Sequence, residues 1–207
     1  MNPSVHHLGP APGDARAAVL FLHGRGSSGS DVTGLADALP VDGVAWLAPS
    51  AAGGTWYPLR FVVPTAENEP YLGNALGTVD QLFGKLRAAG LPPERIGLAG
   101  FSQGACLALE YAARRPRRYG FVAALSGALI GPLETPRPPF DLAGTPVLLG
   151  CAEHDAHVPP EYVEHTACVL AEASTDLTRQ RFPGSAHTVF PEETEWMRRA
   201  LERIAAA

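Results

Sequence analysis

A serine flanked by glycines, in Gly100-Phe101-Ser102-Gln103-Gly104, is the strongest candidate for covalent chemistry in this sequence. It matches the pattern G-x-S-x-G, in which a serine occupies a sharp turn between a strand and a helix. The apolar residues before it are typical of a strand, and residues 105–109 begin a helix. Glycines suit such a turn because a nearby Cβ would clash. The pattern predicts that Ser102 is a nucleophile; the alternative is a glycine-rich turn with an unused serine.

A serine hydroxyl becomes a strong nucleophile only when a base accepts its proton. In hydrolases with this motif the partners follow in the order serine, acid, histidine, each after a strand. His187 fits the last place because it follows a predicted strand at 177–182 through a short loop. The other histidines precede the serine, lie in a predicted helix or follow an earlier strand: His6, His7, His23, His154, His157 and His165. The sequence therefore predicts His187 as the base.

The acid is expected after the predicted strand at 146–150, where Glu153 and Asp155 both qualify on chemistry. Asp155 is preferred because it lies further into the loop, and its role would be to hold the His187 imidazole in one tautomer. Glu153, His154, Asp155 and His157 could alternatively form a metal site. Side chains so close in sequence seldom converge on one ion, and no other His or Cys cluster completes a ligand set. We therefore expect no metal.

Acyl transfer also needs backbone N–H groups that stabilise the negative charge on the carbonyl oxygen. One donor is expected from Gln103, the residue after the nucleophile. The other is expected from the loop after an early strand, where Gly24 and Gly26 flank Arg25 and let its N–H turn inward. The Arg25 side chain has two open interpretations, exposure to solvent or contact with an anionic substrate.

The elements that must position these residues alternate between short apolar runs and amphipathic stretches, which is typical of βαβ units. Strands are predicted at 17–23, 43–48, 95–100, 121–125, 146–150 and 177–182. Most are continuously apolar, as expected of parallel strands covered on both faces. One helix is predicted from the apolar stripe of Leu72, Leu76, Val79, Phe83 and Leu86, and another begins at Pro191.

This pattern predicts a single α/β domain at 17–207, with a mostly parallel central sheet and helices on both faces. Residues 1–16 are expected to form a loosely ordered segment or an edge strand. The stretch 49–70 has no clear periodicity, yet it contains Trp56, Tyr57 and Phe61. A loop of this length in a compact domain is usually functional or disordered, and the aromatic residues favour function. If exposed, these aromatic residues could support a dimer contact as well as a substrate lid.

Composition restricts the partners and the compartment. The chain of 207 residues is 46% hydrophobic and 18% charged, which is typical of one globular domain. Its formal charge of −5 gives no electrostatic reason to expect nucleic acid, and the basic run at 114–118 is interpreted as the end of a helix. The apolar run at 17–22 is far shorter than the roughly 20 residues that span a bilayer, so we expect no stable membrane insertion.

Three cysteines, Cys106, Cys151 and Cys168, are far apart and lack the CxxC spacing. They are interpreted as small apolar core residues in a reducing compartment, and the protein is expected to be cytoplasmic. A mature form whose leader had been removed would have the same sequence.

These motifs together resemble the phospholipase/carboxylesterase family of α/β-hydrolases, which includes acyl-protein thioesterases and small bacterial carboxylesterases. The similar segments are LFLHGRGSSGSD (20–31), WYPLRF (56–61), LAGFSQGACLAL (98–109), ALSGAL (124–129), AEHDAHVP (152–159) and GSAHTV (184–189).

The resemblance implies an α/β-hydrolase fold and a serine hydrolase without a cofactor. It implies a triad of Ser102, Asp155 and His187, with backbone donors at Arg25 and Gln103. It also implies that the loop around Trp56 and Tyr57 lines or caps the acyl pocket and that Leu129 contributes to it. Arg25 departs from the apolar residue of eukaryotic members, which argues against a long lipid-like acyl group.

The expected reaction is hydrolysis of a small-molecule carboxylic ester with a short-to-medium acyl chain, by a monomer or homodimer. Acyl-protein thioesterase or lysophospholipase activity would use the same triad, which does not select the leaving group. A non-catalytic binding module is a more distant alternative, since such a protein would usually have lost a member of the triad. A dehalogenase-like enzyme would need Asp, and a dienelactone-hydrolase-like enzyme Cys, in place of Ser102.

Overall fold

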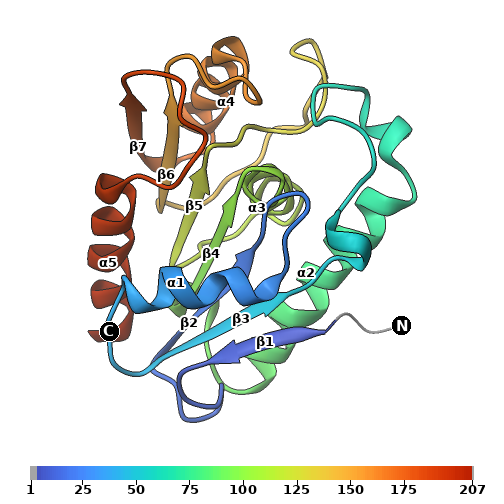
Figure 1. The fold of residues 1–207 in the computed structure, drawn as a ribbon. Helices are drawn as coiled ribbons and strands as arrows, with labels where there is room; N and C mark the ends of the chain where they lie inside the picture. The colour runs from blue at the N-terminus through green and yellow to red at the C-terminus, as the bar shows by residue number, and fades with distance from the viewer. Residues whose placement is uncertain (1–3, 207) are drawn as a thin grey trace.

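Seven strands form one sheet in the order β1-β3-β2-β4-β5-β6-β7 (Figure 1). The structure is a computed structural model and describes residues 4–206. The strands are β1 (Val5–Leu8), β2 (Ala17–Leu22), β3 (Val44–Pro49), β4 (Ile96–Phe101), β5 (Phe121–Leu125), β6 (Thr145–Ala152) and β7 (Thr175–Phe182). Strands β2 to β7 run parallel, and β1 pairs antiparallel with β3 at one edge. The predicted α/β architecture with a mostly parallel sheet is confirmed.

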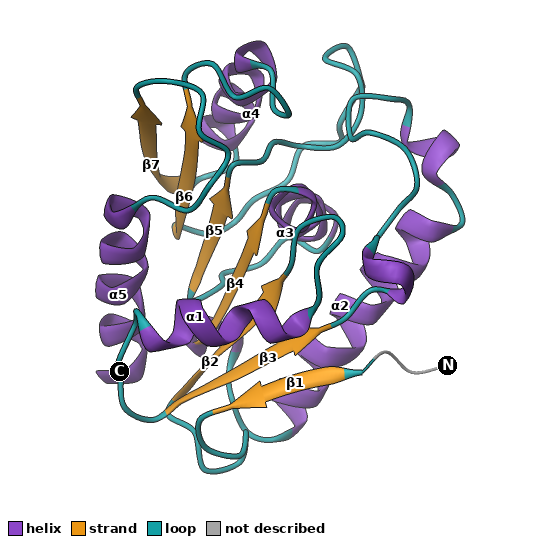
Figure 2. Ribbon diagram, in the orientation of Figure 1, coloured by secondary structure: helices purple, strands orange, loops and turns teal. Residues whose placement is uncertain are grey.

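Helices cover both faces of this sheet (Figure 2). One face carries α2 (Tyr71–Ala88), α3 (Gln103–Arg114) and α4 (Pro160–Glu172), and the other carries α1 (Val32–Asp37) and α5 (Pro191–Ala206). Short 3-10 turns occur at Gly29–Asp31, Ala52–Gly54, Thr65–Asn68 and Pro93–Arg95. The helix predicted from the apolar stripe is α2, which buries Leu72, Val79, Phe83 and Leu86. The sheet thus separates two apolar layers of one domain.

Whether a strand is continuously apolar depends on whether helices cover both of its faces. Every residue of β2, β3 and β5 is buried, because helices pack on both sides of the central strands. Strand β7 lies at the open edge and alternates between exposed and covered positions, so its first residues lack an apolar run. For that reason the sequence predicted its start at 177, two residues later than the observed Thr175.

One expectation about the cysteines is wrong. Cys168 is exposed on α4, whereas Cys106 and Cys151 are buried as predicted. The aromatic residues Trp56 and Tyr57 do not form an exposed patch, because both are buried against the core.

Residues 1–3 of the predicted N-terminal segment and residue 207 of the predicted domain lie outside the described residues. Within residues 4–206, the structure contains no helix both long enough and apolar enough to cross a bilayer. The carboxyl ends of β2, β4, β6 and β7 point to the same edge of the sheet, because these strands are parallel. Ligands bind at this edge in open α/β sheets.

Candidate active site

Ser102 occupies the sharp turn between β4 and α3 in a left-handed conformation, with φ 53° and ψ −119°. Helix α3 passes so close to the sheet that a Cβ at Gly104 would overlap the Leu22 carbonyl. A Cβ at Gly100 would in turn overlap the backbone of Gly104. The glycines on both sides of the serine are therefore required by close packing, as the motif predicts. The turn presents the Ser102 hydroxyl at the carboxyl end of the sheet.

Ser102, His187 and Asp155 form one continuous chain of hydrogen bonds. Ser102 Oγ lies 2.8 Å from His187 Nε2, and His187 Nδ1 lies 2.6 Å from Asp155 Oδ2. Because a carboxylate only accepts, Nδ1 carries the proton, and Nε2 is free to accept the serine proton. The Asp155 side chain is fully buried, whereas 18% of the His187 side chain is exposed. The structure therefore brings together the three residues that the sequence predicted.

The loop that carries His187 is fixed at both ends. At its start, the Gly184 carbonyl accepts a 3.0 Å hydrogen bond from His154 N. Past His187, Ser126 Oγ donates to the Thr188 carbonyl at 3.3 Å. At its end, Glu193 in the first turn of α5 accepts a 2.8 Å hydrogen bond from Phe190 N, the geometry of one half of a capping box. The imidazole is therefore positioned by packing of the loop as well as by Asp155.

Glu193 is an unusual cap because its side chain is completely buried and its Oε1 has no hydrogen-bond partner among the described residues. Burial raises the pKa of this carboxyl to about 8, and the backbone hydrogen bond from Phe190, which lowers the pKa, offsets only part of this effect. The carboxyl is therefore protonated at neutral pH.

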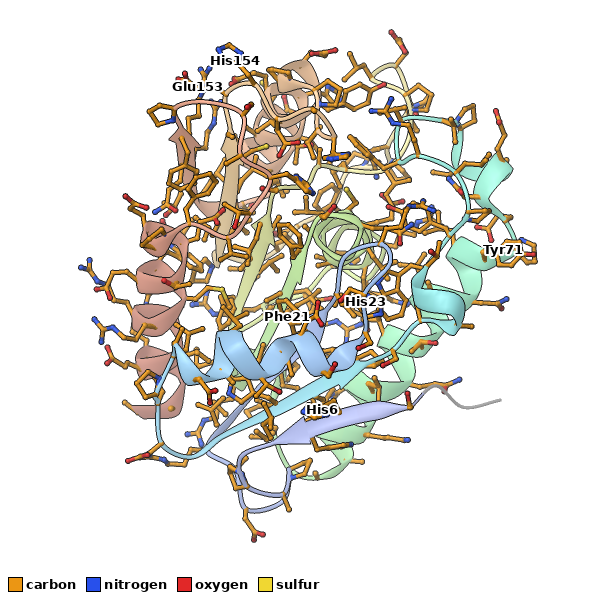
Figure 3. The ribbon with its side chains drawn as sticks, viewed as in Figure 1. His6, Phe21, His23, Tyr71, Glu153 and His154 are labelled. Carbon is orange, nitrogen blue, oxygen red and sulfur yellow. The ribbon has the colours of Figure 1, made fainter. Side chains whose placement is uncertain are left out.

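The alternative acid, Glu153, lies elsewhere. Its carboxylate lies 3.8 Å from the guanidinium of Arg181, and 40% of its side chain is exposed. Figure 3 shows Glu153 and His154 together at the outer rim of the molecule. No group of three or more His, Cys, Asp or Glu side chains between residues 4 and 206 is arranged to hold a metal ion.

The two residues expected to supply backbone N–H donors lie close to Ser102 in the fold. Gln103 begins α3 directly after Ser102, and Arg25 lies in the loop after β2. Both residues line the same pocket as Ser102 and His187. Neither N–H donates to an acceptor among the described residues. They are therefore available to a substrate oxygen, which is the arrangement expected of an oxyanion hole.

His23 and Trp56 hold the loop that contains Arg25. The His23 ring accepts a 3.0 Å hydrogen bond from Ala51 N at Nε2, so its Nδ1 donates to the Gly24 carbonyl at 2.7 Å. Burial lowers the pKa of His23, so this histidine is a neutral structural group at the end of β2 (Figure 3). The Trp56 indole donates to the His23 carbonyl at 2.9 Å.

The side chains of Gln103 and Arg25 bind the loop after β3, which contains Trp56 and Tyr57. Gln103 accepts from Trp56 N at 3.0 Å and donates to the Tyr57 carbonyl at 2.8 Å. The Arg25 guanidinium donates to the carbonyls of Tyr57, Pro58 and Leu59 at 2.9–3.0 Å. Both residues expected to supply backbone donors therefore also fix the pocket wall through their side chains.

A pocket of about 320 Å³ opens beside Ser102. Its walls are Gly24, Arg25, Tyr57, Arg60, Phe61, Phe101, Gln103, Cys106, His157, Val158 and His187. Tyr57 lines the pocket as predicted, but Trp56 and Leu129 do not. Trp56 packs behind the wall against His23, with ring centroids 4.8 Å apart, and Leu129 is buried where its N–H donates to Thr166. The structure therefore places Trp56 and Leu129 outside the lining of this pocket.

The sequence did not assign Arg60, Phe61 or His157 to the substrate pocket, although all three line it and Phe61 lies in the loop that its aromatic residues marked as functional. Arg60 and Phe61 belong to the segment WYPLRF and His157 to AEHDAHVP. Both segments carried the family resemblance, and that was the available signal. The centroid of the His187 ring lies 4.6 Å from that of the His157 ring and 5.0 Å from that of the Phe101 ring.

Cys106 also lines the pocket, but it is a poor nucleophile. Burial raises the pKa of its thiol to about 12, and the nucleophilic form of a cysteine is the thiolate. The arrangement as a whole can support attack of an activated hydroxyl on a carbonyl carbon, with two N–H groups for the developing oxyanion.

Comparison with known proteins shows the same similarity along nearly the whole chain. A family model described as Phospholipase/Carboxylesterase matches residues 10–205. Acyl-protein thioesterase 1 of Cryptococcus neoformans is 27% identical over 240 residues, covering 98% of this chain and all of that protein. Carboxylesterase SOBER1 of Arabidopsis thaliana is 26% identical and covers 91% of this chain and 92% of that protein. The crystal structure of a phospholipase/carboxylesterase from Dyadobacter fermentans is 35% identical, covers 96% of both chains and superposes with a TM-score of 0.90.

Proposed function

The chain belongs to the phospholipase/carboxylesterase family of α/β-hydrolases, which are hydrolytic enzymes, and from this we propose that it cleaves carboxylic esters with short-to-medium acyl chains. Ser102 is the nucleophile, His187 the general base and acid, and Asp155 the residue that orients His187. The observation that carries the proposal is the continuous hydrogen-bonded chain from Ser102 Oγ through His187 to Asp155.

The reaction proceeds through an acyl-enzyme. Ser102 Oγ attacks the ester carbonyl while its proton passes to His187 Nε2, and Asp155 stabilises the resulting imidazolium. The N–H groups of Arg25 and Gln103 stabilise the tetrahedral oxyanion. The intermediate collapses by breaking the bond to the alcohol, which leaves with the proton from His187. A water molecule, deprotonated by the same histidine, then attacks the acyl-enzyme and releases the acid and free Ser102.

The pocket supports a small substrate. Its volume of about 320 Å³ is at the small end of the roughly 300–1,000 Å³ typical of ligand sites. Arg25 and Arg60 lie among its walls. A long alkyl chain packs better against uncharged walls, because contact with it would remove water from the charged groups.

The test is hydrolysis of p-nitrophenyl esters from acetate to decanoate by the wild type and by Ser102→Ala. We expect highest kcat/KM on the shorter esters, and loss of nearly all activity in Ser102→Ala. Ser30→Ala is the matched control, because Ser30 is an exposed serine outside the pocket, and it should match the wild type. Full activity in folded Ser102→Ala would disprove the assigned nucleophile.

Thioesterase activity is the second candidate, favoured by the similarity to acyl-protein thioesterase 1 of Cryptococcus neoformans along the whole of that protein. The same residues would act, with a thiol as leaving group. Paired oxygen esters and thioesters with the same acyl group separate the two activities. A higher kcat/KM on the thioester of each pair would assign the chain to the second candidate.

A further inference from the structure

The walls of the pocket beside Ser102 have a charge opposite to that of the whole protein. The chain has a formal net charge of −5. The pocket, however, is lined by two arginines, Arg25 and Arg60, and by no aspartate or glutamate. The Asp155 carboxylate lies behind His187 and is completely buried. A negative group on a substrate would therefore meet only positive or neutral side chains on entering.

Arg60 has donors that no protein group uses. Its side chain is exposed, and its one hydrogen bond among the described residues is a long one, 3.4 Å from Nη2 to the His157 carbonyl. Other arginines form ion pairs with glutamates, as in the pairs Arg114–Glu110 and Arg179–Glu164. No carboxylate within residues 4–206 forms an ion pair with Arg60. Its guanidinium is therefore free to bind an anion at the pocket mouth.

Arg25 contributes a fixed charge beside it. Its guanidinium donates to three carbonyls of the loop that leads to Arg60. These carbonyl oxygens occupy three of its N–H groups but do not cancel its charge, and it forms no ion pair with the described carboxylates. Arg25 and Arg60 together thus give the pocket a positive potential. Arg60 has more donors left for direct contact, because its side chain makes a single long hydrogen bond whereas that of Arg25 makes three.

We propose that the preferred substrate is an ester that carries a carboxylate besides its scissile bond, bound by Arg60 at the mouth of the pocket. The inference rests on the ester hydrolysis proposed above and names its substrate class. The planar guanidinium donates two parallel N–H groups and matches a carboxylate in geometry as well as in charge. The carboxylate can belong to the acyl part or to the alcohol part, and the test below distinguishes the two.

The experiment compares two pairs of esters that differ by one negative charge. On the acyl side, phenyl hydrogen adipate is compared with phenyl methyl adipate, measured by the release of phenol. On the alcohol side, 4-acetoxybenzoate is compared with its methyl ester. The quantity measured is the ratio of kcat/KM for the anionic ester to kcat/KM for the neutral ester, in the wild type and in Arg60→Gln. Comparing this ratio between proteins removes the intrinsic difference in reactivity within each pair.

We expect the ratio to fall about fivefold in Arg60→Gln for one of the two pairs, the size of a favourable exposed charge pair. The affected pair identifies the part of the substrate that carries the carboxylate. Arg60→Lys keeps the charge and should retain much of the ratio. Arg87→Gln is the matched control, because Arg87 is exposed in the last turn of α2, outside the pocket, and its loss changes the net charge equally.

A ratio that is the same in wild type and Arg60→Gln for both pairs would overturn the inference. Continued Ser102-dependent hydrolysis of the neutral esters would then leave the proposed function intact. Failure of the wild type to hydrolyse any of the four esters would overturn both.

Discussion

Asp155 contacts His187 through one of its two carboxylate oxygens and its own loop through the other. Oδ2 lies 2.6 Å from His187 Nδ1, whereas Oδ1 accepts hydrogen bonds from His157 N at 2.8 Å and Val158 N at 3.1 Å. The same side chain therefore fixes the loop after β6 and the imidazole of the loop after β7. This division of roles allows the two to be separated by mutation.

Asp155→Asn should lower kcat while preserving the fold. An asparagine can place its carbonyl oxygen at the position of Oδ1, which keeps the two backbone hydrogen bonds. Its amide then faces His187 Nδ1 as a donor and favours the wrong tautomer, for which a fall in kcat on the order of 10⁴ is known in a serine triad. The measurement is kcat on p-nitrophenyl acetate, with circular dichroism to verify the fold. Glu153→Gln is the control and should retain wild-type kcat; the reverse result would assign the acid to Glu153.

Trp56→Phe should lower kcat by a similar factor for short and long esters. The change removes the indole donor of the 2.9 Å hydrogen bond to the His23 carbonyl, which leaves that buried acceptor unpaired. An unpaired buried group costs roughly 1–3 kcal/mol, and the affected loop carries the Arg25 N–H. Phe61→Leu is the comparison, because Phe61 lines the pocket and its replacement should shift the optimal chain length. A changed chain-length profile in Trp56→Phe would restore the idea that Trp56 contacts substrate.

Glu193 should make the protein less stable as the pH rises. Its pKa is about 8 in the folded protein, where burial favours the neutral form, against an ordinary value of 4.5. The folded state therefore holds this proton more tightly, and the stabilisation is complete below pH 4.5 and disappears as the pH rises through about 8. Each tenfold difference in proton affinity is worth about 1.4 kcal/mol.

Urea denaturation of the wild type and Glu193→Gln at about pH 5 and about pH 9 measures this dependence. Glutamine keeps an acceptor for Phe190 N but does not ionise. The free energy of unfolding of each protein is taken relative to its own value at the lower pH. From the lower to the higher pH, we expect this free energy to fall by up to a few kcal/mol more in the wild type than in the variant. Parallel pH profiles for the two proteins would show that Glu193 does not titrate in this range.

Alkylation of thiols should modify one cysteine without affecting activity. Cys168 is exposed, whereas burial raises the pKa values of Cys106 and Cys151 to about 12. Iodoacetamide at about pH 8 reacts with thiolates, so it should label Cys168 alone. Mass spectrometry of the intact protein counts the labels, and Cys168→Ala should take up none. Labelling of Cys106 accompanied by loss of hydrolysis would indicate that the pocket wall opens in solution.

The sequence was most informative where a residue's role depends on its order along the chain. Ser102, Asp155 and His187 were predicted because each follows a predicted strand, and parallel strands bring their carboxyl ends to one edge. Helix α1 was not predicted, because its six residues include Gly34 and bury only Val32. Such a short element has no periodicity to detect.

The pocket wall could not be predicted because its contacts join residues far apart in sequence. The directions of Trp56 and Tyr57 are set by hydrogen bonds to Gln103, which is more than 40 residues away along the chain. Two adjacent aromatic residues therefore face different environments, and composition alone does not tell which one meets the substrate. Arg25 presents the same problem, since its three carbonyl partners come from another loop.

The left-handed backbone at Ser102 sets function against stability at one position. A non-glycine residue with this positive φ costs on the order of 1–3 kcal/mol, and glycine would adopt the conformation without that penalty. Selection for stability alone would thus replace the serine, whereas the proposed function requires it as the nucleophile. Variants recovered by screening for heat resistance, without a requirement for activity, should accumulate glycine at this position.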